Sequence, residues 1–548
     1  MNQIENKLKD MIISSINDLF SYQIEQDDIV IEIPKDKQHG DYSSNVAMRL
    51  AKALKNSPVK IATSLINDLS KHDSFFDKVE VAGPGFINFT LKNEQITDVL
   101  NVVLNATDDY GRSNTGQGIR VNLEYVSANP TGDLHPGHAR GAAMGDSVAR
   151  IMRFAGFDVT REYYVNDAGN QIDNMALSLQ ARYLQRCHVD AEMPEDGYNG
   201  PDLIVIADKL YNEVQDKYLN MSKAESLPYF RAYGLTEELA KLRNDLGQFR
   251  VEYDVWTSEQ SIYDRHMVEK AVDKLKALDM TYEFEDALWL KTTAFGDDKD
   301  RVIVRSNGLY TYLTPDIAYH IDKFERGFDQ LVNFLGADHH GYINRLKAAV
   351  QALGYDKDRL DIDIIQMARM IKDGEEFKMS KRTGKAVALK DLLDEAGVDA
   401  VRYYFASRAA DTHMDFDLDM AVRQSNDNPV YYAQYAHARV CSILRSGEEY
   451  TQASSYELLN DPKEIDLIKY INEFPKVVSD AATTRQPHKI CNYIQKLAAL
   501  FHSFYGECKV LDPNEVDLSS QRLALVTAVK ITLKNALMLI GVSAPERM

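Results

Sequence analysis

Two histidines in the segment 127–138 are the first side chains whose spacing suggests chemistry. His135 and His138 flank Pro136 and Gly137, where a tight turn leads into the start of a helix. Backbone N–H groups, the positive end of the helix dipole and two imidazoles would then converge on one phosphate-sized site. Gly137 has no side chain, so a flat ring such as adenine could approach the backbone closely. An isolated His-x-x-His is also compatible with loop histidines that cap a helix.

A second group of such residues lies in the segment 377–385, which follows a predicted strand and a Lys-Asp-Gly turn of hairpin type. The stretch 369–390 has seven basic and three acidic residues, although the chain as a whole is acidic. The centre of the segment is Lys378, Met379, Ser380 and Lys381. Two lysines on a glycine-bounded loop suit a triphosphate whose leaving pyrophosphate gains charge in the transition state. The alternative is a solvated basic loop.

Composition and missing motifs exclude several classes of protein. The 548 residues include 63 Lys plus Arg and 83 Asp plus Glu, a net charge of −20, so any nucleic-acid site must be a local basic patch. The phosphate loop of P-loop NTPases and the glycine motif of dinucleotide oxidoreductases are both missing. The four cysteines are scattered, which favours buried thiols over a disulfide framework or a bound metal. We expect a cytoplasmic protein without a membrane partner, because no apolar stretch reaches about 18 residues.

The elements that must position these residues form three predicted domains. Residues 1–95 are expected to be a small α+β domain. In residues 96–427 strands and helices alternate, which predicts an α/β domain with a doubly wound, Rossmann-like parallel sheet. Within it, the polar and helical stretch at about 184–285 is expected to be an insertion. Residues 428–548 are expected to form an all-helical bundle, in which Asn428 caps a helix that starts at Pro429.

Apolar periodicity predicts the individual elements. The predicted strands are 29–33, 79–81, 86–91, 120–126, 158–165, 331–335 and 362–367. The predicted helices are 44–54, 59–70, one from about 138, 430–445, 462–473, 487–505 and 521–540. An opening helix has one apolar face, formed by Ile4, Leu8, Met11, Ile12, Ile16 and Leu19.

The two motifs together, more than two hundred residues apart, resemble the signature of class I aminoacyl-tRNA synthetases. Within that class, the chain resembles arginyl-tRNA synthetases along nearly its whole length. The matching segments are 38–42 with 45–47, 126–132, 164–171, 313–320, 336–341 and 544–548. One departure is Arg382, where the general pattern has Ser. Both lysines are present although many arginyl enzymes lack the second, so we expect Lys381 to act directly.

The resemblance implies an enzyme that activates arginine with ATP and transfers the arginyl group to the 3′-terminal adenosine of tRNA(Arg). Its implied catalytic residues are His135, His138, Lys378 and Lys381. Its implied ATP-binding residues are Gly137, His135, His138, Met379, Ser380 and Lys381. The lysines would hold the β- and γ-phosphates, with Mg²⁺ sharing the developing charge. The family also implies a monomer.

The family's arginine site maps onto Glu124, Asn129, Tyr312, Asp316 and His340. Carboxylates bind a planar guanidinium in bidentate geometry, so we expect Asp316 and Tyr312 at that end of the substrate. Asn129 and Glu124 would then contact the α-amino group. For Glu124 the alternative is a structural salt bridge at the end of a strand, and for His340 some family members have Gln.

By the same resemblance, the N-terminal domain contacts tRNA and the bundle binds the anticodon arm. Tyr435 and Arg439 are the candidate tRNA contacts, because aromatic faces stack on unpaired bases. Helical tyrosines at such spacing are also typical of a core.

Other functions remain open at this point. A synthetase for glutamate or cysteine is one, although the cysteinyl enzyme needs a zinc site. Small adenylyltransferases share the His-x-Gly-His element but lack a long helical bundle. A catalytically inactive relative that binds tRNA is another possibility, and loss of His138 or Lys381 would be its expected mark.

Overall fold

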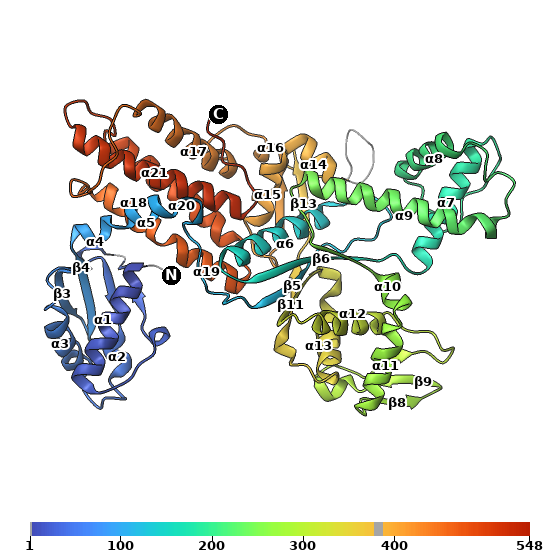
Figure 1. Cartoon of the computed structure of the whole chain (residues 1–548), viewed down its shortest axis with the longest axis horizontal. Coiled ribbons are helices and arrows are strands. Elements are labelled where there is room, and N and C mark those ends of the chain that lie inside the picture. The colour runs from blue at the N-terminus through green and yellow to red at the C-terminus, as the bar shows by residue number, and fades with distance from the viewer. Residues whose placement is uncertain (1–2, 35, 378–386) are drawn as a thin grey trace.

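The computed structural model describes residues 3–34, 36–377 and 387–548. Figure 1 shows a small N-terminal domain in blue and a helical bundle in orange and red on one side of a central sheet. Two lobes in green and yellow-green extend from the other side, above and below the level of the sheet (Figure 1). The architecture is the mixed α/β fold that the sequence predicts, with helical and α+β appendages.

The N-terminal domain packs three helices on an antiparallel sheet with strand order β1-β2-β4-β3. Its elements are α1 (Gln3–Phe20), α2 (Val46–Leu50), α3 (Pro58–Leu69), β1 (Ile31–Glu32), β2 (Tyr42–Ser44), β3 (Phe76–Ala82) and β4 (Phe86–Leu91). Ile4, Leu8, Ile12 and Ile16 of α1 are buried, as predicted. Leu19 is 42% exposed, which corrects its placement on the apolar face.

The central sheet has five strands in the order β12-β11-β5-β6-β7, and every neighbouring pair is parallel. Its strands are β5 (Arg120–Glu124), β6 (Asp158–Val165), β7 (Val255–Ser258), β11 (Gln330–Gly336) and β12 (Leu360–Ile365). The chain runs outward from β5 through β6 to β7, then returns to the other side of β5 with β11. Ligands bind at such a reversal of strand order, outside the carboxyl ends of the strands.

Helices cover both faces of this sheet. Because successive side chains along a strand point to opposite faces, neighbouring residues at the end of β5 contact different helices. On one face Glu124 contacts α12 (Leu313–Glu325), and on the other α6 (Pro136–Phe154) lies beneath the Tyr125 ring. Gly145 of α6 permits that contact, since a Cβ atom there would lie 2.2 Å from the ring. The helix α13 (Ile343–Ala352) links β11 to β12.

Two lobes interrupt the sheet, one on each side of β7. The first, the helical arm, comprises α7 (Asn170–Arg186), α8 (Pro201–Val214) and α9 (Lys223–Gln248), which share their own apolar core. The second comprises α10 (Glu259–Asp264), α11 (Met267–Ala277), β8 (Thr281–Phe284), β9 (Ala287–Leu290) and β10 (Arg301–Val304). The stretch 184–285 therefore contains a strand of the central sheet, which the sequence does not predict. The four residues of β7 are too few to show the alternation of apolar and polar residues that is typical of a strand.

A small sheet follows, with strand order β14-β13-β15. The elements of this region are β13 (Ala368–Lys372), β14 (Glu375–Glu376), α14 (Leu389–Ala396), α15 (Val398–Ala406), β15 (Met414–Asp417) and α16 (Leu418–Ala421). Asp373 and Gly374 join β13 to β14 with φ values of 55° and 77°. Positive φ at both positions is the two-residue hairpin geometry that the Asp-Gly pair predicts.

The C-terminal bundle has five helices, and two short helices that precede the central sheet in the chain pack against it. They are α4 (Asn93–Thr97), α5 (Val99–Ala106), α17 (Pro429–Ser446), α18 (Pro462–Asn472), α19 (Phe474–Thr484), α20 (His488–Glu507) and α21 (Val516–Leu539). The Asn428 side chain accepts a hydrogen bond from the N–H of Val430, which confirms the predicted cap. The sequence predicts no helix at 474–484, where α19 lies. Only one residue separates α19 from α18, so no turn marks the start of a new helix.

Several exclusions made from the sequence can be compared with the described residues. None of their helices combines the length and apolar character that a membrane-spanning helix requires. Within 3–34, 36–377 and 387–548, no three His, Cys, Asp or Glu side chains are grouped as a metal site. Cys441, Cys491 and Cys508 are buried free thiols, whereas Cys187 is only partly buried.

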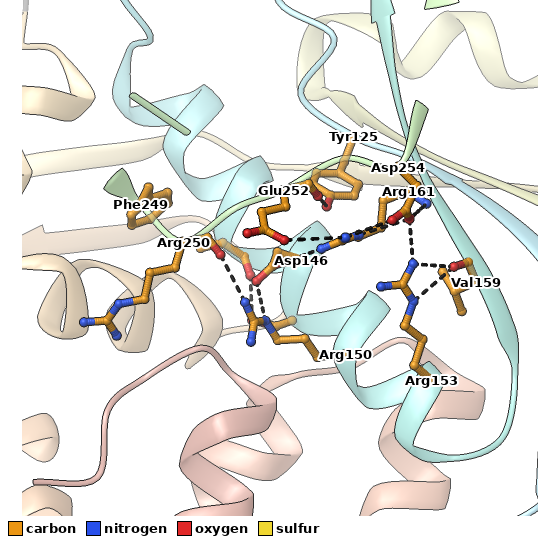
Figure 2. A network of polar contacts seen from close by, with 12 residues as sticks. Tyr125, Asp146, Arg150, Arg153, Val159, Arg161, Phe249, Arg250, Glu252 and Asp254 are labelled. Carbon is orange, nitrogen blue, oxygen red and sulfur yellow. Dashed lines mark hydrogen bonds and ion pairs between the residues drawn. The ribbon is translucent and has the colours of Figure 1, made fainter. Parts of the chain in front are cut away.

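A buried ionic network joins α6 to the segment after α9. Asp146 of α6 pairs with Arg150 at 2.7 Å, and Arg150 also donates to the carbonyl of Arg250 at 3.1 Å. Arg161 of β6 forms two hydrogen bonds to Asp254, of 2.9 and 3.1 Å (Figure 2). The second half of α6 is therefore bonded to the segment after α9.

Candidate active site

The carboxyl ends of β5, β11 and β12 open into a cavity of about 690 Å³. Residues 126–129 and 131–134 after β5 form one of its walls, and residues 334–339 around the end of β11 form another. The remaining lining residues are His135, Gly137, His138, Gly141, Ile365 and Met367. This is the crevice at the reversal of strand order, where an open α/β sheet binds its ligand.

His135 and His138 lie together at the start of α6. The Nδ1 of His135 accepts hydrogen bonds from the N–H groups of Gly137 and His138, at 3.0 and 3.3 Å. The two rings stack with centroids 3.6 Å apart. His135 is thus a helix cap, as one interpretation of the motif predicts, and it also lines the cavity.

The electrostatics of the pair favour neutral imidazoles at pH 7. Burial lowers the pKa of His135, and burial with the neighbouring ring lowers that of His138 to about 4. The Nδ1 of His138 is buried and has no hydrogen-bond partner among the described residues. A buried polar atom without a partner is costly, so a bound ligand at this position would satisfy it.

Gly137 is packed too closely for any side chain. A Cβ atom there would lie 2.9 Å from the His135 ring and 3.4 Å from the Met367 sulfur. Any residue other than glycine would therefore crowd the His135 ring.

The second motif is only flanked by described structure. Lys378, Met379, Ser380 and Lys381 lie outside the described residues. On their far side, the N–H of Leu389 donates to the carbonyl of Leu134 at 2.6 Å. The chain leaving the second motif is thus bonded directly to the loop that carries His135.

Carboxylates gather at the end of β5 and the start of α12. Burial raises the pKa of Asp316 to about 6, and the nearby charge of Glu124 adds to this shift. The Tyr342 hydroxyl donates a hydrogen bond to Asp316 Oδ2. Burial, followed by the charges of Asp316 and Asp167, raises the pKa of Glu259 to about 7. These raised values indicate a shortage of positive charge, which a cationic ligand would supply.

Glu259 and Tyr342 are the residues that sequence reasoning missed. Glu259 begins α10, directly after the unpredicted strand β7. Asp167, from the matching segment 164–171, accepts hydrogen bonds from Ser258 Oγ at 2.6 Å and from the N–H of Gln260 at 2.9 Å. It therefore fixes the backbone on both sides of Glu259. In the sequence, only the matching segment 164–171 indicates this part of the site, and no motif marks Glu259 itself.

Glu124 forms the salt bridge considered as its alternative role. Its Oε2 lies 2.5 Å from the Nζ of Lys323, which is fully buried. Its Oε1 accepts a hydrogen bond of 2.9 Å from Ser127 Oγ. Ser127 also lines the cavity, so it connects the nucleotide-sized space with the acidic group.

The other three predicted arginine contacts lie in three different segments of the chain. Tyr312, immediately before α12, is 84% exposed. Asn129 lines the cavity, and its Nδ2 donates to Gln171 Oε1 at 2.7 Å. His340 belongs to the short 3₁₀ helix Ala337–Tyr342, and its side chain lies outside the described residues.

Tyr435 and Arg439 are both exposed on α17. The Tyr435 ring stacks between those of Tyr431 and His502, with centroids 6.0 and 6.1 Å away. The Arg439 guanidinium lies 4.9 Å from the centre of the Tyr505 ring and donates to its hydroxyl at 2.9 Å. Exposed stacked rings beside a cation form a surface suited to unpaired bases.

Comparison with protein families covers nearly the whole chain. A model described as the tRNA synthetases class I (R) catalytic domain matches residues 99–440. An arginyl tRNA synthetase N terminal domain matches residues 6–91, and a DALR anticodon binding domain matches residues 433–548.

Curated relatives and solved structures agree with these matches. An arginine–tRNA ligase of Bacillus subtilis is 54% identical over 524 residues, which are 95% of this chain and 94% of the relative. One from Bacillus licheniformis is 53% identical and is covered completely, as is this chain. A putative arginyl tRNA synthetase structure from Campylobacter jejuni has a TM-score of 0.76 at 36% identity, over 84% of this chain and 100% of its own. The Thermus thermophilus arginyl-tRNA synthetase shares the fold, with a TM-score of 0.77 at 22% identity over 99% of this chain and 100% of its own.

Proposed function

Because the chain belongs to the arginyl-tRNA synthetase family, we infer that it is an arginine–tRNA ligase that joins arginine to tRNA(Arg) at the expense of ATP. The observation that carries this inference is the group of carboxylates beside a nucleotide-sized cavity. Asp316 and Glu259 have raised pKa values, and of these three carboxylates only Glu124 is paired with a buried lysine. A cationic amino acid is the substrate that such a group would bind.

The reaction has two steps, and neither requires a covalent enzyme intermediate. The carboxylate of arginine attacks the α-phosphorus of ATP, and the bond to the pyrophosphate oxygen breaks. A ribose hydroxyl of the terminal adenosine of tRNA then attacks the carbonyl carbon of arginyl-adenylate, and AMP leaves. The protein contributes positioning and electrostatic stabilisation.

We propose that the cavity beside His135 and His138 holds ATP. Neutral imidazoles and the N-terminal end of α6 can donate to phosphate oxygens and to the nucleoside. Gly137, Met379 and Ser380 would complete the nucleotide site. Lys378 and Lys381 would stabilise the pyrophosphate as it leaves.

Mg²⁺ is a further part of this proposal. It is usually bound by substrate phosphates, waters and one or two carboxylates, so it needs no cage of protein ligands. Asp338 is a suitable carboxylate, because it lines the cavity and its charge acts on both histidines. Bound there, Mg²⁺ would neutralise charge on the phosphates.

Asp316 and Glu259 would bind the guanidinium of arginine. Each carboxylate is partly protonated without a ligand at neutral pH, and a guanidinium within hydrogen-bonding distance stabilises the ionised form. Tyr342 fixes one oxygen of Asp316 through its hydroxyl. Asn129 and Glu124 remain our candidates for the α-amino group, with Tyr312 and His340 as further contacts.

We propose that the three domains, 1–95, 96–427 and 428–548, divide the work of tRNA binding and catalysis. The first would contact the body of tRNA, and the last would bind the anticodon arm through Tyr435 and Arg439. We also propose that the enzyme acts as a monomer in the cytoplasm, which sedimentation and cell fractionation would test.

Exchange of pyrophosphate into ATP tests the function directly. The assay is run with each of the twenty amino acids, with and without total tRNA. Of the twenty amino acids, we expect only arginine to support the exchange. Of the tRNAs, we expect only tRNA(Arg) to be charged. Exchange driven by glutamate or cysteine would contradict the assignment, and no exchange with any amino acid would indicate an inactive relative.

A further inference from the structure

The loop that carries His135 is attached to the helical arm at two points. At its start, Asn129 is bonded to Gln171 of α7. At its centre, Asp133 forms an ion pair with Lys241 of α9, more than a hundred residues later in the chain. A loop held at both points has its backbone position set by the arm.

Lys241 lies between two carboxylates that belong to different parts of the molecule. Besides Asp133, its Nζ lies 3.7 Å from Asp202, in the first turn of α8. The Lys241 side chain is 28% exposed, and that of Asp202 is 12% exposed. One ammonium group therefore joins the His135 loop to both helices that form the base of the arm.

Glu238 lies one turn before Lys241 on α9 and completes this group. Its side chain is buried, with the Oε2 atom lacking a hydrogen-bond partner among the described residues. Burial and the charge of Asp202 raise its pKa to about 8. The protonated carboxyl can therefore donate to Asp202 and hold that carboxylate beside Lys241.

Beside the ion pair, a narrow space lies between the His135 loop and the helical arm. A cavity of about 240 Å³ separates them. Thr131 and His135 belong to its loop wall, and Leu203 and Glu238 belong to its arm wall. The ion pair spans this space beside the apolar core that Leu242 and Leu246 of α9 share with Leu134 of the loop.

The opposite edge of the same loop is bonded to the end of the second motif. The N–H of Leu389 donates to the carbonyl of Leu134, the residue directly after Asp133. Displacement of Asp133 would therefore move His135 and strain the bond to the residues after the second motif.

We propose that Lys241 is a positioning residue through which the helical arm holds the His135 loop in register for adenylate formation. This rests on the proposed function. Lys241 acts through Asp133 and not on the substrate, so its loss should slow the chemical step without removing any arginine contact.

The test compares Lys241→Met, Lys241→Arg and Lys209→Met. Lys209 pairs with Glu237 across the same two helices, on a more exposed side of the arm, so its variant controls for loss of an arm salt bridge. Melting temperatures identify any variant that fails to fold. Hydrogen exchange of residues 126–138 measures anchoring of the loop independently of activity.

We expect Lys241→Met to accelerate hydrogen exchange in residues 126–138. It should also lower kcat for adenylate formation about tenfold and leave the KM for arginine unchanged. Lys241→Arg should restore both, and Lys209→Met should change neither. The inference would be overturned if Lys241→Met left hydrogen exchange of the loop unchanged. It would also be overturned if hydrogen exchange became faster while kcat stayed unchanged. A wild-type chain that fails to charge arginine would refute the proposed function, while the exchange measurement would still decide whether Lys241 anchors the loop.

Discussion

At the scale of single residues, the proposed role of the acidic group would explain how one site selects a cation over neutral solutes. Burial raises the pKa values of both Asp316 and Glu259, and the charge of Asp316 raises that of Glu259 further. Protons satisfy them in the absence of arginine, which limits the repulsion between two buried charges. A guanidinium replaces those protons with fixed hydrogen bonds, whereas a neutral side chain of similar size would leave them protonated.

We predict that Asp316→Asn and Glu259→Gln each raise the KM for arginine about 30- to 100-fold. Each change removes one charged hydrogen-bond partner of a buried guanidinium, a loss of about 2 to 3 kcal/mol. The KM for ATP should change less than threefold, because both carboxylates lie outside the set of cavity-lining residues. Steady-state charging kinetics measure both values. Equal increases for the two substrates would show that these carboxylates support the fold instead.

The pH dependence of arginine binding should follow the same two groups. Their pKa values, about 6 for Asp316 and about 7 for Glu259, lie above the ordinary range, so both carboxyls are largely protonated at pH 5.5. Binding requires the ionised forms, and affinity should therefore rise with pH, about tenfold per unit below the pKa of each group. Calorimetry with arginine alone from pH 5.5 to 8 avoids titration of ATP. In Glu259→Gln the rise between pH 6 and 7 should become shallower, and an unchanged profile would exclude Glu259.

Asp316 and His135 are identifiable in the sequence because each lies in a motif that matches a family. Glu259 is not, because it follows a four-residue strand whose pairing with β6 depends on residues nearly a hundred positions earlier. The role of Asp167 is hidden for the same reason, since its contacts to Ser258 and Gln260 exist only in the folded chain. Local patterns predict which residues begin and end elements, whereas they do not predict which distant charges meet.

At the scale of elements, the predicted strands of the central sheet are confirmed, because β5, β6 and β11 each precede a helix of regular period, whereas β12 (Leu360–Ile365), predicted at 362–367, precedes another strand. The segment 158–165 is predicted to the residue, and 120–126 is two residues too long. The base of the helical arm differs from the central sheet, because ion pairs beside a cavity hold it as well as apolar packing. Such a base responds to pH, and Glu238 determines how.

We predict that Glu238→Gln makes stability less sensitive to pH. In the folded chain the pKa of Glu238 is raised from 4.5 to about 8, by burial and by Asp202. A raised pKa means that its favourable contribution is complete below about pH 4.5 and is lost as pH rises towards 8, at about 1.4 kcal/mol per pKa unit. Urea unfolding at pH 5.5 and 8.5 should therefore show a smaller decrease for the variant, by about 2 to 4 kcal/mol. Glu237→Gln is the control on the same helix, because Glu237 is only partly buried and is paired with Lys209, and it should show the same pH dependence as wild type.

At the scale of the whole molecule, one buried arginine joins the catalytic domain to the bundle. Arg402 of α15 donates to the carbonyl of Ile540 at 3.0 Å and to that of Phe249 at 2.9 Å. It also pairs with Asp146 of α6, the centre of the network in Figure 2. The end of α21, the end of the helical arm and the helix that begins at His135 thus share one guanidinium. A shift of the bundle would be transmitted to all three.

Gly541→Ala tests this connection. Gly541 has a φ of 68°, and a Cβ atom there would lie 2.3 Å from the Arg402 guanidinium, so the change introduces strain and displaces a fully buried charge. We predict a loss of at least about 2 kcal/mol of stability and a lower rate of tRNA charging, since Arg402 can no longer hold Ile540 and Asp146 together. Gly506→Ala is the matched control in the same bundle, because no atom lies within 4 Å of its Cβ position and alanine favours helix. Urea unfolding and charging assays compare the two variants. If Gly541→Ala behaves like Gly506→Ala in both, the guanidinium does not couple the bundle to the catalytic helix.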